Sequence, residues 1–300
     1  FPSLEKFYPE AMNIVLPDAA WVYEQNGASG LLSTVTWCSQ AGAEYLILVH
    51  GFGGWAPPFG IVFVADRLAA LFLLLLAVLV LFTTWTLRAG PTARRALPLL
   101  FLLAFGLTGA FLTGDLFNLF VMFEVVLLAS YLLLQVPGSD RSVRAAFPNI
   151  AINLVASILF FVGVGLAYGA TGTVNLADLA VRLDDVDPGL RNGLGWLLFM
   201  VFGIKAAIFP LFFWLPDSYP VAPTPVTALF AGLLTKIGVY AIIRTQTLLF
   251  PSDEPSTFML IIAGLTMIVG VLGVLIVAGE YSTGLIRTTF AAVGRRTRVL

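Results

Sequence analysis

The sequence predicts an all-α membrane protein, a polytopic bundle of about seven transmembrane helices in which one helix is broken at residues 205–210. Hydrophobic residues make up 59% of the chain and charged residues only 11%. The mean hydropathy of +0.95 is far above that of water-soluble domains. A membrane-spanning helix needs roughly 20 mostly apolar residues. Such runs occupy residues 61–87, 97–113, 115–136, 148–169, 193–213, 225–249 and 257–279.

The two ends of the chain differ in composition from these spans. Residues 1–50 are polar, aromatic and irregular, so we expect an extramembrane arm there, followed by a transmembrane domain over residues 51–279. Residues 280–300 form a basic tail. We expect no cleavable signal peptide, because Glu5 and Glu10 interrupt the start and no basic region leads into an apolar one.

Arginines alternate between the loops. The loops after the first, third and seventh predicted spans are basic, whereas the others are acidic or uncharged. The positive-inside rule therefore places the basic loops inside and residues 1–60 outside. The basic loops contain Arg88, Arg94, Arg95, Arg141, Arg144, Arg287, Arg295, Arg296 and Arg298.

Several classes of site are not expected. Cys38 has no second cysteine to pair with, and His50, the one histidine, lies outside the predicted spans. We therefore expect no metal, no cofactor and no histidine-based catalytic centre. A membrane-embedded enzyme has no motif in its favour, and no nucleic-acid partner is expected.

Three charged side chains lie deep within the apolar runs, namely Glu124, Lys205 and Lys236. A charge at the bilayer centre costs at least about 2.5–3.5 kcal/mol, so such residues are usually kept for ion or proton movement. Because they lie on three different spans, we predict that they form a proton relay. Glu124 and Lys205 could hold a proton when they are close and release it when they separate.

The sequence around Lys205 predicts a helix break. Gly203 precedes the lysine and Pro210 follows it. Proline removes a backbone donor and displaces the carbonyl four residues earlier, which belongs to Ala206. Broken helices at membrane depth are tolerated where they line a cavity, and transporters place ion sites there.

Polar residues at helical spacing extend from these charges. Asn149, Asn153 and Ser157 share one face of the fourth span. They either join helices through hydrogen bonds or line a water path. Tyr131 follows Glu124 by two turns and Tyr240 follows Lys236 by one, so both are candidates for path lining. Arg244 lies further along the same helix face as Lys236 and Tyr240, near the end of the span, and we expect its side chain to extend to the membrane surface.

Three stretches resemble a known family: GGWAPPFGIVFVADRLAAL, GDLFNLFVMFEVVLLASY and FGIKAAIFPLFFWLPDSYPVAPTPVTALFAGLLTKIGVYAIIR. They are similar to the D subunits of multisubunit Na⁺/H⁺ antiporters of the Mrp type, relatives of membrane subunits of respiratory complex I. The resemblance covers roughly residues 50–275. It implies that Glu124 is the essential glutamate of the fifth family helix. It likewise makes Lys205 the lysine of the broken seventh helix and Lys236 that of the eighth.

Two departures from the family pattern matter. Complex I subunits usually read H-x-WLPDAH where this chain reads FFWLPDSY (212–219), without a histidine. Family members also carry two helices before the span at 61–87 and about five after the last span, with a second, inverted repeat. Residues 279–300 stand where a basic turn similar to QRDLRRILA is expected. We expect both ends to be truncated or altered, leaving one of the two repeats.

The leading prediction is a proton-translocating subunit of a multisubunit cation/proton antiporter in a prokaryotic plasma membrane. Its expected partners are other membrane subunits of the complex, protons and Na⁺, and the lipid bilayer, and it is not an enzyme. Two alternatives stay open. One is a proton-pumping membrane subunit of NADH–quinone oxidoreductase, and the other is a structural fragment without transport activity.

Overall fold

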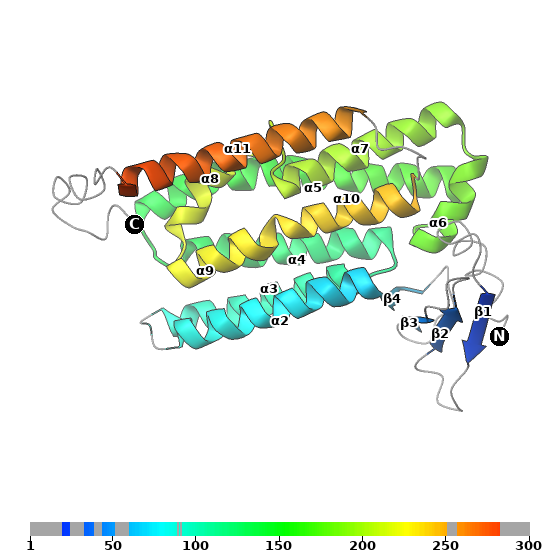
Figure 1. Cartoon of the computed structure of the whole chain (residues 1–300), viewed down its shortest axis with the longest axis horizontal. Helices are drawn as coiled ribbons and strands as arrows, with labels where there is room; N and C mark the ends of the chain where they lie inside the picture. Colours follow the sequence, from blue (N-terminus) through cyan, green and yellow to red (C-terminus); the bar gives the residue numbers. More distant parts are fainter. Residues whose placement is uncertain are drawn as a thin grey trace.

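The computed structural model describes residues 20–24, 33–38, 44–51, 60–88, 90, 92–250 and 257–282. Long helices run side by side, and a small sheet lies at one end of the bundle, with α8 and α9 at the other (Figure 1). The α-helices are α2 Arg67–Leu87, α3 Ala93–Leu112, α4 Leu116–Gln135, α5 Asp140–Thr171, α6 Leu176–Arg182, α7 Pro188–Ala206, α8 Leu215–Ser218, α9 Thr224–Leu229, α10 Lys236–Leu248 and α11 Thr257–Ser282. Short 3-10 helices at Leu183–Asp185 and Tyr219–Val221 and a π-helical segment at Phe230–Leu234 complete the helical structure of these residues.

The helical membrane bundle predicted from composition is confirmed. Within the described ranges, five helices are long and apolar enough to cross a membrane: α2, α3, α4, α5 from Ser142, and the continuous run Thr224–Leu248. The apolar stretch Thr257–Gly273 of α11 is shorter. Helix α7 is not among the five, and it has 19 residues including two cations, Arg191 and Lys205.

The first span begins later than predicted. Val62–Ala65 form strand β4, and the helix starts only at Arg67. Asp66 sets this boundary because its Oδ1 accepts a hydrogen bond from the amide of Ala69 at 2.8 Å, which caps the helix. The predicted start at residue 61 is therefore wrong by one short strand.

The N-terminal arm contains an antiparallel sheet with strand order β1-β2-β3-β4. Strands β1 (Ala20–Glu24), β2 (Ser33–Cys38) and β3 (Glu44–Gly51) precede β4. Valine, threonine and aromatic residues are frequent in these segments and favour strands. The prediction of an irregular arm is wrong for these residues, and the other residues of 1–50 lie outside the described ones.

The connection between α3 and α4 is a tight hairpin, in agreement with the predicted spans 97–113 and 115–136, which a single residue separates. Asp115 caps α4, since its Oδ1 accepts from the amide of Asn118 at 2.7 Å. The amide of Gly114 donates to the carbonyl of Val62 at 2.7 Å. A Cβ at Gly114 would lie 2.9 Å from Val64 Cγ2, so this close approach of β4 requires glycine. The hairpin thereby joins the sheet to the bundle.

Helix α7 breaks where the sequence predicts. It ends at Ala206, the next residue, Ala207, has a φ of 54° in the left-handed region, and helical structure resumes only at Leu215. The indole Nε1 of Trp214 donates to the carbonyl of Ile204 at 3.2 Å. This hydrogen bond satisfies one of the carbonyls that the broken helix leaves free.

Candidate functional site

Three side chains from three helices meet in the middle of the bundle: Glu124 of α4, Ser157 of α5 and Lys205 of α7. Lys205 Nζ donates to Ser157 Oγ at 3.3 Å, and Ser157 Oγ donates to Glu124 Oε1 at 2.5 Å. We call these three residues the Glu–Ser–Lys cluster. The sequence predicted a relay role for the two charges and left the role of Ser157 open, and it could not show that the serine stands between the two charges.

The cluster is largely buried. Lys205 is 3% exposed and Ser157 5% exposed, whereas Glu124 is half-buried. Among the described residues, no nitrogen–oxygen distance within 4 Å joins the lysine directly to the carboxylate. The serine hydroxyl is therefore the link, because it accepts from one charged group and donates to the other.

The break in α7 helps to stabilise the buried lysine. Lys205 lies in the last turn of its helix, where the free carbonyls and the helix dipole favour a positive charge. Its Nζ also lies 5.0 Å from the centroid of the Phe123 ring, within the range of a cation–π contact. Without such partners, a buried ammonium would lose much of its solvation free energy, and no contact in the protein would replace it.

Two glycines allow the chain to pack around the lysine. A Cβ at Gly238 would lie 2.8 Å from the carbonyl carbon of Lys205, so α10 touches the broken end of α7 backbone to backbone. A Cβ at Gly203 would lie 2.8 Å from Ile208 Cδ1, in the chain that folds back after the break. Gly203 was predicted from the sequence but Gly238 was not, because only the packing of the two helices shows the second contact.

The predicted asparagines lie next to the cluster. Asn149 and Asn153 are both 2% exposed. Asn153 Nδ2 donates to Asn149 Oδ1 at 2.8 Å and to the Asn149 carbonyl at 3.0 Å. Together with Lys205 they line a small cavity of about 10 Å³.

Phenylalanines pack against the sheet side of the cluster, and one of them, Phe123, also lines the small cavity. The rings of Phe123, Phe160 and Phe202 form a buried group with centroid separations of 5.0 to 6.0 Å. Phe160 lies three residues after Ser157 on α5, and Phe202 three residues before Lys205 on α7. Because α5 runs towards the sheet end and α7 away from it (Figure 1), both rings lie on the sheet side of the cluster. We call these three residues the phenylalanine layer.

Lys236 lies apart from the cluster. Its Nζ donates to the carbonyl of Ala231 at 2.6 Å and to Thr235 Oγ1 at 3.2 Å, and the residue is exposed on the surface of the described chain. Ala231 belongs to the π-helical segment Phe230–Leu234. The structure therefore places this lysine at the edge of the bundle, whereas Lys205 lies within it.

The two tyrosines proposed as path lining have different surroundings. The Tyr131 hydroxyl is buried and has no hydrogen-bond partner among the described residues. The Tyr240 hydroxyl donates to the carbonyl of Phe111 at 2.6 Å and accepts from Arg244. Tyr240 is thus held in the wall of the bundle by α3.

A second charged pair was not predicted from the sequence. Arg244 of α10 donates to both oxygens of Asp66, at 2.5 and 2.9 Å. Arg244 was predicted to extend to the membrane surface, and its guanidinium does lie at the end of the first span, where it is paired with Asp66. No sequence signal links residues this far apart, although a carboxylate inside the predicted span 61–87 is a signal that a partner exists.

The pair changes the acidity of Asp66, which lies just outside the first span. Burial raises the pKa of the Asp66 carboxyl, but the hydrogen bonds and charge of Arg244 and the amide of Ala69 outweigh burial. The pKa of Asp66 is therefore lower than its usual value of 3.8, and the group is ionised at neutral pH.

Long apolar helices around a buried, hydrogen-bonded cluster of a carboxylate and a lysine define a class of protein. This is a polytopic membrane protein with ionisable groups inside the bilayer, an arrangement typical of ion and proton carriers. The family follows from sequence comparison. The chain belongs to the family described as "NADH:quinone oxidoreductase/Mrp antiporter, TM", whose model matches residues 113–277, more than half of the 300 residues.

Curated relatives are antiporter subunits. The chain is 46% identical over 234 residues to the D subunit of the Na⁺/H⁺ antiporter of Alkalihalophilus pseudofirmus, an alignment that covers 76% of this chain and 48% of the relative. It is 48% identical over 207 residues to the D subunit of a probable K⁺/H⁺ antiporter of Rhizobium meliloti, covering 67% of this chain and 38% of the relative. The chain thus spans about half, or less, of the length of the relatives that it matches.

Solved structures of related complexes share the fold. A chain of the Mrp complex from Dietzia sp. is 38% identical with a TM-score of 0.65, covering 76% of this chain and 43% of that chain. A chain of respiratory complex I from Thermus thermophilus is 26% identical with a TM-score of 0.60, covering 70% of this chain and 46% of that chain.

Proposed function

We propose that this chain is a proton-translocating membrane subunit of a multisubunit monovalent cation/proton antiporter, in which Glu124, Ser157 and Lys205 carry the proton. One observation carries the proposal. A serine hydroxyl joins a carboxylate to a lysine in the interior of the bundle, at 2.5 and 3.3 Å. The antiporter subunits among the relatives support the exchange of a proton for a monovalent cation such as Na⁺.

The cluster can move a proton without displacing a heavy atom far. The Lys205 ammonium gives one proton to Ser157 Oγ while the serine proton passes to Glu124 Oε1. This step leaves a neutral amine, an intact hydroxyl and a protonated carboxyl. Burial penalises the charged forms and their mutual attraction favours them, so the two states can lie close in free energy. Small movements of α7 against α5 then change which state is preferred.

Lys236 serves as the next station in this proposal. It lies midway along the apolar run Thr224–Leu248 and is exposed on the surface of the described chain. An uncovered ammonium at that depth is costly in lipid. We infer that further membrane subunits, or the part of the family fold that this chain does not span, cover Lys236 and accept its proton.

The cellular location of the protein and its orientation in the membrane are also proposals. The relatives and the apolar helices support a plasma membrane of a prokaryote, and the arginine-rich loops support an outer location for residues 1–60. The chain then acts as a secondary transporter subunit, not as an enzyme. A role in an NADH–quinone oxidoreductase is the alternative, supported by the likeness to complex I from Thermus thermophilus.

A serine substitution tests the proposal. The chain is expressed with sister antiporter subunits in an antiporter-deficient host, and Na⁺-dependent proton flux is measured in inverted vesicles. Ser157→Ala is expected to abolish most of the flux while the complex still assembles. Ser130→Ala is the matched control, since Ser130 is buried on α4 and, within the part of the chain that the structure describes, its hydroxyl bonds only to the Leu127 carbonyl of its own helix. Full flux with Ser157→Ala would contradict the proposal.

A further inference from the structure

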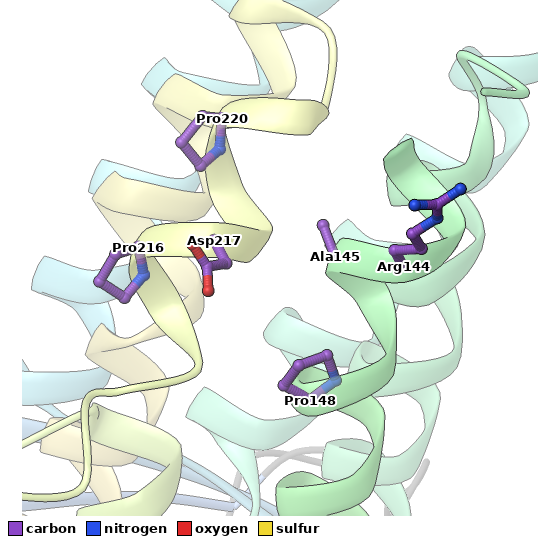
Figure 2. Close-up of a pocket in the computed structure, with 6 residues that line it drawn as sticks. All are labelled: Arg144, Ala145, Pro148, Pro216, Asp217 and Pro220. Atoms are coloured by element: carbon purple, nitrogen blue, oxygen red, sulfur yellow. The ribbon is translucent and has the colours of Figure 1, made fainter. Parts of the chain in front are cut away.

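A polar cleft opens at the end of the bundle opposite the sheet. Its volume is about 240 Å³, and it lies between the first turns of α5 and the segment that contains α8. Figure 2 shows Asp217 on the α8 side of the cleft and Arg144 on the α5 side. The lining residues are Arg144, Ala145, Pro148, Pro216, Asp217 and Pro220.

The two charged residues of the cleft have opposite signs but are not paired. Arg144 and Asp217 are both exposed, and neither forms an ion pair with another residue that the structure describes. A guanidinium on one wall and a carboxylate on the other are complementary to a ligand that carries a negative group beside a positive one. The cleft therefore suits a zwitterion.

Two prolines add hydrogen-bond acceptors to the cleft. Pro148 lies inside α5 and has no amide hydrogen, so the carbonyl of Arg144, four residues earlier, lacks its helical hydrogen bond. Pro220 likewise cannot donate to the carbonyl of Pro216, and the amide of Tyr219 donates to Leu215 instead. Because Arg144 and Pro216 both line the cleft, their carbonyl oxygens are available to a donor that binds there.

These groups define the chemistry of the ligand. One carboxylate and two carbonyl oxygens match a primary ammonium, which has three N–H donors. Arginine matches a phosphate, which its guanidinium binds through two hydrogen bonds. A quaternary ammonium has no N–H to donate, and an anionic phosphate ester without an amine would bring a negative charge against Asp217. The expected ligand is therefore a phosphate ester with a primary amine.

The position of the cleft favours a lipid as the source of this group. Helix α5 has 32 residues and is about 48 Å long, whereas the hydrocarbon core of a bilayer is about 30 Å thick. Its first turns, which line the cleft, therefore lie at the level of the lipid headgroups. Phe147 and Phe213, each close in sequence to a lining residue, are 73% and 56% exposed, and they offer apolar surface to acyl chains.

We propose that the cleft binds the headgroup of a phospholipid of the phosphatidylethanolamine class. Arg144 binds the phosphate, and Asp217 binds the ammonium together with the carbonyls of Arg144 and Pro216. The bound lipid joins the start of α5 to the segment that contains α8. This site does not rest on the proposed proton relay, because binding is measured without transport.

Cysteine protection tests the site. In a Cys38→Ser background, the chain is assembled with its sister subunits in lipid nanodiscs and treated with a hydrophilic maleimide. Ala145→Cys reports on the cleft, and Arg95→Cys, exposed at the same end but not lining the cleft, corrects for general effects of the lipid. Phosphatidylethanolamine should slow labelling of Ala145→Cys at least about fivefold relative to pure phosphatidylcholine, and phosphatidylglycerol should not.

Charge substitutions link the protection to the proposed contacts. Asp217→Asn should remove most of the difference between phosphatidylethanolamine and phosphatidylcholine. Asp185→Asn is the matched control, since Asp185 is also exposed but lies in the short helix Leu183–Asp185, away from the cleft. Loss of the difference in both variants, or in neither, would overturn the site.

A second measurement needs no cysteine in the cleft. In detergent, added phosphatidylethanolamine should raise the Tm of the assembled complex more than phosphatidylcholine does. Arg144→Gln should lose most of this extra shift, whereas Arg95→Gln should retain it. Equal extra shifts in the two variants would contradict the role of Arg144.

The remaining outcomes identify the ligand. Equal protection by phosphatidylethanolamine and phosphatidylcholine would overturn recognition of a primary ammonium, and stronger protection by phosphatidylglycerol would indicate an anionic lipid instead. Soluble glycerophosphoethanolamine shares the polar groups but has no acyl chains. If it slowed labelling as much as the lipid does, the ligand would be a soluble phosphate ester, and the lipid proposal would be wrong.

Discussion

The two sides of the Glu–Ser–Lys cluster are built differently. Towards the sheet, the phenylalanine layer packs ring against ring, and its three members are almost completely buried. Towards α8, the next turns of α5 carry Asn153 and Asn149, a small cavity and then a polar cleft. The two sides therefore differ in polarity, with aromatic rings on the sheet side and amide groups, a cavity and a polar cleft on the α8 side.

This asymmetry has a direct consequence for transport. A carrier that opened to both sides at once would dissipate the proton gradient. Substitutions on the sheet side should therefore raise leak, whereas substitutions on the α8 side should lower coupled flux. The following substitutions test this difference between the two sides of the cluster and the contacts that hold the helices around it. They are given from the largest expected effect on stability to the smallest.

The largest effect is expected from Phe202→Ala on the sheet side. Removing a fully buried phenylalanine costs about 3–5 kcal/mol of stability, because a cavity replaces the ring. Thermal unfolding in detergent measures this loss, and the decay of an imposed pH gradient without Na⁺ should accelerate. Phe161→Ala, at a side chain 57% exposed on the same helix as Phe160, should change neither quantity much. An unchanged leak with Phe202→Ala would show that the phenylalanine layer is no barrier.

A smaller loss is expected from Arg244→Met. Removing this partner leaves the Asp66 carboxylate partly buried without its main donor, which costs about 1–3 kcal/mol. The pair lies between α2 and α10, away from the cleft, so coupled flux per assembled complex should change little. A thermal shift no larger than that of Arg244→Lys would show that the two-fold contact contributes nothing.

The pH dependence of the same pair has a defined sign. Because the pKa of Asp66 in the folded chain is below its usual value of 3.8, its ionised form stabilises the fold above that pH. The stabilisation is lost as pH falls below about 3.8 through the folded pKa. Thermal unfolding between about pH 6 and pH 3 should therefore show a steeper acid loss in the parent than in Asp66→Asn. Parallel curves would contradict this assignment.

Gly238→Ala should cost about 1–3 kcal/mol, as other overpacking substitutions do. Its Cβ would press on the backbone at Lys205, so it should also shift the lysine and reduce flux. Gly264→Ala on α11 is the matched control, since its Cβ meets nothing within 4 Å among the described residues. Equal flux in the two variants would show that the position of α7 tolerates this contact.

Much of this architecture could be predicted from the sequence. The apolar runs predicted the helical bundle, although five of the described helices, and not the seven predicted, are long and apolar enough to cross a membrane. Gly203 with Pro210 predicted the break after Lys205. The asparagines and Ser157 were found from helical spacing. Spacing alone could not distinguish residues that join helices through hydrogen bonds from residues that line a water path. The strand before α2 was missed, because Val62–Ala65 are apolar enough to continue a span.

The remaining features depend on contacts between distant segments. The Asp66–Arg244 pair, the approach of Gly238 to Lys205 and the α5–α8 cleft join residues that the sequence separates widely. The bridging position of Ser157 depends on the relative rotation of α4, α5 and α7. A single sequence carries no information about such rotation, so only the packed structure shows it.

The central claim is that Glu124 and Lys205 act on one proton through Ser157. A double-mutant cycle on Na⁺-dependent proton flux tests it most directly, with Glu124→Gln, Lys205→Ala and the double variant in complexes of equal assembly. We predict strong non-additivity, with the double variant no worse than either single variant, because each substitution interrupts the same transfer. Effects in the double variant equal to the sum of the two single effects would contradict the account.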